Sequence, residues 1–183
     1  MKIENNKTKM MVLSAVFLAI GMILPFITMQ IPELGSMLLP LHIPVLLCGF
    51  FCGWQYGLTI GFILPLLRSM IFSMPPLMPT AIAMAFELAT YGCVMGLLSR
   101  KRKGIPWTYI SLIITMIIGR IVWGIASFVL YQMLGNGFTL KLFFAQGFVN
   151  AIPGILVQLI LIPAIIRVVH KDSLSNPKFL SQR

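Results

Sequence analysis

The amino-acid sequence predicts an all-α, polytopic membrane protein with six transmembrane helices and both termini in the cytoplasm. The first observation behind this prediction is composition, because 58% of the 183 residues are hydrophobic and only 10% are charged, whereas soluble domains carry about 25% charged residues. The second is a series of apolar runs, several of them near the ~20 residues that a helix needs to cross a bilayer. The third is the clustering of basic residues between and beyond those runs.

The six expected helices are mainly apolar and are separated by segments rich in glycine, proline or basic residues. They cover residues 9–30, 42–52, 58–72, 80–98, 107–133 and 142–169. We expect a tight turn at 53–57, and three prolines within 73–79 exclude a helix there because proline removes a backbone donor and clashes with the preceding turn. Pro153 and Pro163 can bend the sixth helix. We interpret residues 1–183 as one domain with polar ends at 1–8 and 170–183.

The net charge of +10 is concentrated at particular places along the chain. Eleven of the fourteen basic residues lie near the two termini and in the loop 100–103, whereas Lys141 alone falls in a loop expected on the opposite side. Cytoplasmic loops carry such an excess of Lys and Arg. We therefore expect a multi-pass protein of the cell membrane, in contact with lipid, and no nucleic-acid partner.

Three charged residues, Arg68, Glu87 and Arg120, lie inside the apolar segments. A charge within a membrane helix costs a few kcal/mol, so it usually faces a cavity or a partner and marks function. Their positions along the expected helices place them between the outer ends and the midplane, the layer that also holds polar side chains from other helices. Those side chains are His42, Gln146 and Asn150.

This layer predicts a polar site that opens to the outside and binds a small solute. An arginine can hold a carboxylate by paired hydrogen bonds, while Glu87 can accept bonds from hydroxyl, amine or ring N–H groups. Asn150 and Gln146 can orient either kind of group, and Tyr91 and Trp123 can stack against a ring. The alternative is that Arg68 and Glu87 pair with each other and only fix helix packing, and that Tyr91 and Trp123 are packing residues.

The sequence contains few motifs typical of nucleotide binding, metal binding or catalysis. There is no Gly-Lys-Ser/Thr loop for phosphate, and two histidines and four acidic residues are too few for a convincing metal or hydrolase set. We expect no enzyme, no metal site and no cofactor. A stand-alone secondary transporter that uses Glu87 as a proton-coupled carboxylate remains an alternative to a solute-binding subunit.

Four segments resemble a known family. They are AVFLA at 15–19, LHIPVLLCG at 41–49, PPLMPTA at 75–81 and AFELATYG at 85–92. Together with the chain length and the six expected helices, they are similar to the substrate-binding (S) component of energy-coupling factor (ECF) transporters. The resemblance is to the branch with pantothenate, pyridoxine and hydroxymethylpyrimidine carriers, and it covers nearly the whole chain.

The resemblance implies a subunit that captures a water-soluble vitamin or its precursor outside the cell for ATP-driven uptake. It implies partners as well: a transmembrane coupling subunit, which Ala15 and Ala19 would contact, and two cytoplasmic ATPase subunits. Two buried arginines favour pantothenate slightly, because it carries a carboxylate, over pyridoxine and hydroxymethylpyrimidine.

Overall fold

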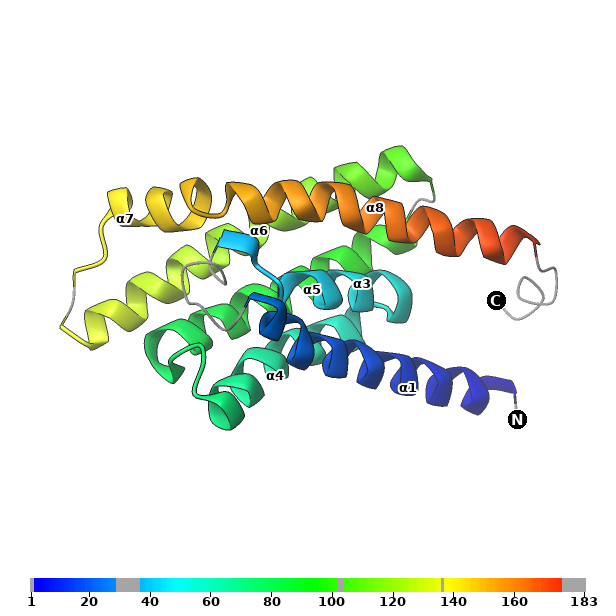
Figure 1. The fold of residues 1–183 in the computed structure, drawn as a ribbon, viewed down its shortest axis with the longest axis horizontal. Helices are drawn as coiled ribbons and strands as arrows, with labels where there is room; N and C mark the ends of the chain where they lie inside the picture. Colours follow the sequence, from blue (N-terminus) through cyan, green and yellow to red (C-terminus); the bar gives the residue numbers. More distant parts are fainter. Residues whose placement is uncertain (1, 29–36, 102–103, 136, 176–183) are drawn as a thin grey trace.

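A computed structural model describes residues 2–28, 37–101, 104–135 and 137–175, and every regular element within those ranges is helical (Figure 1). The α-helices are α1 (Lys2–Ile23), α3 (His42–Cys52), α4 (Trp54–Phe72), α5 (Ile82–Lys101), α6 (Ile105–Met133), α7 (Leu140–Phe144) and α8 (Ile152–Ser175). Shorter segments of other helical geometry are the 3₁₀ turn η1 (Leu24–Thr28) and the π segments η2 (Leu77–Ala81) and η3 (Ala145–Val149). The predicted all-α fold is confirmed.

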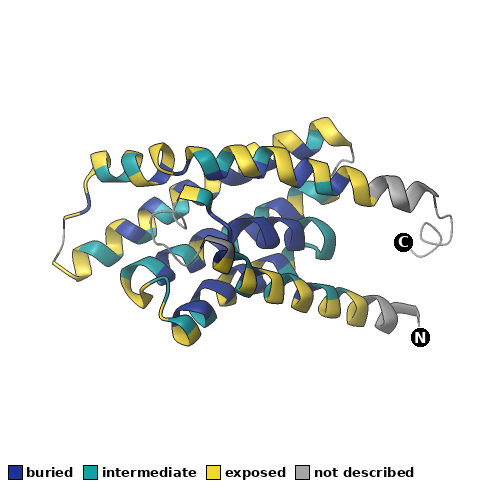
Figure 2. Ribbon diagram, viewed as in Figure 1, coloured by how far each residue is buried: buried dark blue, intermediate teal, exposed yellow. Residues whose placement is uncertain are grey.

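Five segments among the described residues are long and apolar enough to cross a membrane. They are Lys7–Phe26, Trp54–Phe72, Leu77–Arg100, Ile105–Met133 and Leu140–Val169. Exposed residues, most of them apolar, cover the outward faces of α1, α6 and α8, while α3 and much of α5 are buried (Figure 2). An apolar exterior around a buried centre is the arrangement expected when lipid is the solvent.

The second predicted helix, over 42–52, is α3, which is short and central. Its 11 residues rise only about 16 Å, which is well below the thickness of a bilayer. It packs against α1, α4, α5 and α8, and all residues from His42 to Gly49 are buried. Because neighbouring helices surround it, α3 does not need the length that lipid would demand.

Glycines allow α3, α4 and α5 to approach each other closely. A Cβ atom on Gly49 or Gly57 would overlap the carbonyl oxygen of Gly92, and one on Gly92 would overlap the backbone of Gly57. This corrects the tight turn predicted at 53–57. Only Gly53, with φ of 98°, breaks the helix, and α4 begins directly after it because Gly57 serves close packing instead of a turn.

Two prolines account for other differences from the predicted boundaries. The first helix starts at Lys2, earlier than predicted. It tightens to η1 at Leu24, next to Pro25, which cannot donate a backbone hydrogen bond. The predicted end at Gln30 lies outside the described residues. The predicted sixth helix is divided into α7, η3 and α8, with a turn at 150–151 just before Pro153. Proline is compatible with the first turn of a helix, so α8 can begin at Ile152, directly before Pro153.

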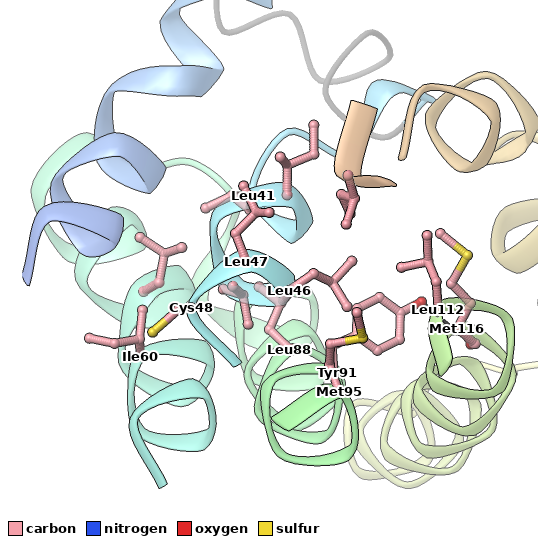
Figure 3. Packing of buried hydrophobic residues seen from close by; sticks show 14 of the residues in the cluster. Leu41, Leu46, Leu47, Cys48, Ile60, Leu88, Tyr91, Met95, Leu112 and Met116 are labelled. Carbon is pink, nitrogen blue, oxygen red and sulfur yellow. Dashed lines mark hydrogen bonds between the residues drawn. The ribbon is translucent and has the colours of Figure 1, made fainter. Parts of the chain in front are cut away.

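The bundle has two distinct ends (Figure 1). The start of α1, the end of α8 and the junction of α5 with α6 lie at one end, and η2, α7 and η3 lie toward the other. Between the ends, a hydrophobic core joins α3, α5 and α6, with Leu46, Leu88, Tyr91 and Met116 packed together (Figure 3).

Candidate functional site

Glu87 on α5 is the centre of a buried group of polar side chains. Its Oε1 lies 3.0 Å from Nη1 of Arg120 on α6 and 3.4 Å from Nε2 of His42 on α3. Glu87 and His42 are at most 1% exposed and Arg120 is 4% exposed. Three helices therefore bring together one carboxylate, one guanidinium and one imidazole at a place without water contact.

Tyr91 completes this group, which we call the Glu87 cluster: His42, Glu87, Tyr91 and Arg120. It lies one turn after Glu87 on α5, and its ring meets that of His42 edge-on at a centroid distance of 5.1 Å. The ring points toward α6 (Figure 3), where its hydroxyl donates a long hydrogen bond of 3.5 Å to the Met116 carbonyl oxygen. A Cβ atom at Gly119 would overlap the Tyr91 ring, so α6 carries glycine where that ring packs.

The Glu87 cluster has more hydrogen-bonding groups than partners. Nε and Nη2 of Arg120 and both ring nitrogens of His42 are buried and form no hydrogen bond among the described residues. In arginine, Nε and Nη2 share one edge of the planar guanidinium, and that edge matches the two oxygens of a carboxylate. Arg120 thus forms an ion pair with Glu87 through Nη1, while its Nε–Nη2 edge and Glu87 Oε1 form no hydrogen bond among the described residues.

Aromatic side chains cover the side of Arg120 toward the end of α6. The Arg120 guanidinium lies 5.9 Å from the centre of the Trp123 ring, which stacks on Phe143 at 6.1 Å. Phe143 in turn packs where Gly124 leaves space. Trp123 therefore lies at the edge of the site, next to the ion pair, in a position suited to hold the guanidinium in place.

Arg68 does not join the Glu87 cluster. Its Nη1 donates a hydrogen bond of 2.6 Å to the Met22 carbonyl oxygen at the end of α1, and its guanidinium lies beside the contacting rings of Phe26 and Phe72, at 5.3 and 5.2 Å from their centres. The pairing of Arg68 with Glu87 that the sequence left open is therefore replaced by a pairing of Arg120 with Glu87. The end of a helix leaves carbonyl groups unpaired, which explains why Arg68 is drawn to Met22.

Gln146 and Asn150 lie apart from the buried cluster as well. Both are exposed, Gln146 in η3 and Asn150 in the turn before α8. The predicted helix over 142–169 is one apolar span, but it has π geometry at η3 and a turn at 150–151 before Pro153. The predicted role of Gln146 and Asn150 in binding remains untested.

Sequence reasoning missed several polar residues that the structure buries, three of which have side-chain atoms without a hydrogen bond among the described residues. Ser111 and Thr115 on α6 and Gln158 on α8 are each at most 1% exposed. A helical projection of residues 105–133 offered a signal, because Ser111, Thr115 and Gly119 recur at four-residue spacing, next to Arg120, on the face with the smallest side chains.

Ala15 and Ala19 lie on an outward face of α1, where both are exposed along with Val12 and Val16. Small residues at four-residue spacing permit close approach of another membrane helix. The described part of the chain does not use this face for its own packing.

Comparison with known proteins gives one finding. A family model described as "ECF transporter, substrate-specific component" matches residues 9–166. Searches of curated proteins and of solved structures gave no match.

Proposed function

This chain belongs to the family of ECF transporter substrate-specific components, and on that premise we propose that it captures a water-soluble vitamin or vitamin precursor outside the cell. Membership in the family makes the chain a multi-pass subunit of a membrane transporter and not an enzyme, and it implies association with an ECF module. The substrate itself has to be inferred from the site.

We infer that the substrate is a carboxylic acid, with pantothenate favoured over pyridoxine and hydroxymethylpyrimidine. The observation that carries this inference is the guanidinium of Arg120, whose Nη1 is held by Glu87 at 3.0 Å while Nε and Nη2 have no acceptor among the described residues. A buried N–H without an acceptor costs free energy, and a carboxylate on this edge would supply two acceptors at once. Pantothenate has such a carboxylate, whereas the other two vitamins have none.

Glu87 and His42 have supporting roles in this proposal. Glu87 fixes the orientation of Arg120 before the substrate arrives, which lowers the cost of ordering a long side chain on binding. His42 lies 3.4 Å from the same carboxylate oxygen and can offer a further hydrogen bond to the solute.

We propose that the termini face the cytoplasm and that η2, α7 and η3 face outward. The basic residues support this orientation, because Lys7 and Lys9 lie in the first half of α1 and Arg100 lies in the last turn of α5, at the same end of the bundle. In this orientation a solute from outside would approach the Glu87 cluster through the end that carries η2 and η3.

We propose that the exposed face of α1 with Ala15 and Ala19 docks on the transmembrane coupling subunit, with two ATPase subunits bound below. Substituting both alanines by tryptophan should abolish co-purification of the chain with the coupling subunit and leave solute affinity unchanged. The same pair of substitutions at Ile113 and Ile117, which are exposed on α6, is the matched control and should leave the complex intact.

A secondary transporter that uses Glu87 for protons has less support. A carboxylate that carries protons must be released from its counter-ion during each cycle, and Glu87 has Arg120 and His42 as buried partners. Uptake by the chain alone, in cells without coupling and ATPase subunits, would establish that function instead.

The proposed substrate is tested by mass spectrometry of small molecules that co-purify with the chain. We expect a carboxylic acid, pantothenate first, at a ratio near one per chain, and its loss from an Arg120→Lys variant purified in parallel. Recovery of pyridoxine or hydroxymethylpyrimidine from the wild type would contradict the carboxylate and leave family membership untouched.

A further inference from the structure

The Glu87 cluster contains one acidic group and two basic groups around a single oxygen atom. Oε1 of Glu87 lies 3.0 Å from Nη1 of Arg120 and 3.4 Å from Nε2 of His42. An arginine guanidinium is always charged, whereas an imidazole gains or loses its charge near neutral pH. All three residues are at most 4% exposed. The net charge of this buried group therefore depends on whether His42 holds an extra proton.

The other helices around α3 place their charged residues elsewhere. Helix α3 packs against α1, α4, α5 and α8, and α5 presents Glu87 and the Tyr91 ring to the imidazole of His42. The one charged residue of α4, Arg68, is bonded to a carbonyl group of α1. The charged residues of α1 lie in its first half, and those of α8 lie in its second half. Among the described residues, Glu87 and Arg120 therefore set the electrostatic surroundings of His42.

A carboxylate on Arg120 would change the charge balance of this site. Without solute, the negative charge of Glu87 and the positive charge of Arg120 cancel while His42 is neutral. A solute carboxylate at the Nε–Nη2 edge of Arg120 adds a second negative charge, and an unbalanced buried charge is costly. A proton on His42 restores the balance, because it adds a second positive charge beside Glu87.

We propose that His42 takes up a proton when the solute carboxylate binds to Arg120, so that the chain binds the acid together with a proton. This inference rests on the proposed function and adds a second ligand, the proton, to the same site. The proton comes from solution and bonds to the ring nitrogen that carries no hydrogen. No other covalent bond forms or breaks.

The imidazole of His42 is better suited to accept this proton than the carboxylate of Glu87. Both ring nitrogens of His42 are buried and form no hydrogen bond among the described residues. A charged imidazole carries an N–H on each nitrogen, so it strengthens the interaction of Nε2 with Glu87 and gains a second donor at Nδ1. A proton on Glu87 would instead remove its ion pair with Arg120, and carboxylates take up protons only in more acidic solution than imidazoles do.

Titration calorimetry of the wild-type full-length chain tests the proton uptake. Pantothenate and its neutral alcohol analogue pantothenol are titrated in two buffers of different ionisation enthalpy, between about pH 7 and pH 8.5. We expect uptake of about one proton per pantothenate and none per pantothenol. Pantothenate affinity should fall by up to about tenfold per pH unit as the pH rises, because protons become scarcer, whereas pantothenol affinity should stay constant.

Nitrogen NMR identifies the group that takes up the proton. The sequence contains two histidines, His42 and His170, so a His170→Gln chain carries His42 as its only histidine. This chain is labelled with ¹⁵N-histidine, purified without a histidine tag, and compared alone, with pantothenate and with pantothenol. The chemical shifts of the ring nitrogens distinguish a neutral from a charged imidazole. We expect His42 to be charged with pantothenate and neutral in the other two samples.

The variant His42→Gln removes the proton acceptor and keeps an amide N–H near Glu87. His170→Gln is the matched control, because it is the same substitution at the polar C-terminal end. We expect His42→Gln to bind pantothenate without proton uptake and roughly tenfold more weakly near pH 7, with pantothenol affinity within about twofold of the wild type. His170→Gln should match the wild type in proton uptake and in both affinities. If His42→Gln does not fold, the NMR comparison decides the assignment, because it leaves the site unchanged.

The possible outcomes separate this inference from the proposed function. Pantothenate binding by the wild type without proton uptake overturns the inference and leaves the proposed function intact. Proton uptake that persists in His42→Gln, or a His42 ring that stays neutral with pantothenate or is already charged without solute, overturns the role of His42. A wild type that binds no pantothenate, or that binds pantothenol equally well, overturns the proposed substrate and this inference with it.

Discussion

The two faces of α5 are built in different ways. Toward α3 and α4, Gly92 and Gly96 bring backbone against backbone with no room for a Cβ atom. On the same helix, toward α6, Glu87 pairs with Arg120 and the Tyr91 hydroxyl donates to the Met116 carbonyl oxygen. The first face is determined by the absence of side chains, and the second by side chains whose hydrogen-bonding capacity exceeds that of their partners.

This difference indicates how the bundle can hold the Glu87–Arg120 ion pair in position while other N–H groups of Arg120 stay unpaired. Close glycine packing fixes α3, α4 and α5 as one unit, so that His42 and Glu87 are presented from a rigid support. Arg120 comes from α6, which packs on this unit through the Tyr91 ring at Gly119. The predictions below test the glycine face first and then the polar face.

The largest expected effect is on the glycine face. Gly92→Leu should yield no folded, monodisperse protein, because a side chain there requires α4 and α5 to separate, at a cost above the ~1–3 kcal/mol of ordinary overpacking. Size-exclusion chromatography after membrane extraction measures this. Gly137→Leu is the control, since nothing lies within 4 Å of a Cβ atom at that position. A monodisperse Gly92→Leu chain with wild-type melting would show that the helices are not in close contact.

The second prediction concerns the ion pair of the polar face. Arg120→Met should lower the free energy of unfolding by about 3–5 kcal/mol, because it leaves the buried Glu87 carboxylate without its counter-ion. The double variant Glu87→Gln with Arg120→Met should recover most of that stability and still fail to bind the acid. Thermal melting and calorimetric titration of both variants measure the two effects. Stability losses that simply add in the double variant would argue against the pair.

The third prediction separates Arg68 from the polar face. Arg68→Met should cost about 1–3 kcal/mol of stability, through loss of the bond to the Met22 carbonyl oxygen and of the contacts with Phe26 and Phe72. Solute affinity should stay within about threefold of the wild type. An affinity loss above tenfold with unchanged melting would instead support the substrate-binding role that the sequence predicted for Arg68.

The smallest effects are expected at the exposed amides. Gln146→Ala and Asn150→Ala should change affinity by less than about twofold and melting by less than about 2 °C, because surface substitutions are usually near neutral. Parallel titrations with the wild type provide the measurement. A loss above tenfold at either position would mean that η3 turns inward when the solute binds.

Much of the fold could be predicted from the sequence because its cause is local. Apolar runs, prolines and basic clusters act through neighbouring residues, so the spans and most of their ends were predictable. The start of α4 was not, because whether Gly57 bends the chain or packs against Gly92 depends on a helix more than thirty residues away.

The candidate site could be predicted only in part for a related reason. The residue types and approximate depth of His42, Glu87 and Arg120 follow from position along each helix, but which arginine meets Glu87 depends on helix rotation. The sequence suggested Arg68 as the partner of Glu87, whereas the rotation of α6 turns Arg120 toward Glu87 on α5. Thr115 and Gln158 escaped attention because uncharged polar residues are common in membrane helices, and only their lack of partners distinguishes them.

The central claim is that the edge of Arg120 formed by Nε and Nη2 recognises a carboxylate, and calorimetric comparison of pantothenate with its alcohol analogue pantothenol tests it most directly. Arg120→Lys keeps the charge beside Glu87 and lacks the bidentate edge. We expect the wild type to prefer pantothenate by roughly 100-fold and the variant by less than about tenfold, because paired bonds between charged groups contribute about 1.5–3 kcal/mol each. Equal affinity of the wild type for both solutes, or an undiminished preference in Arg120→Lys, would contradict the claim.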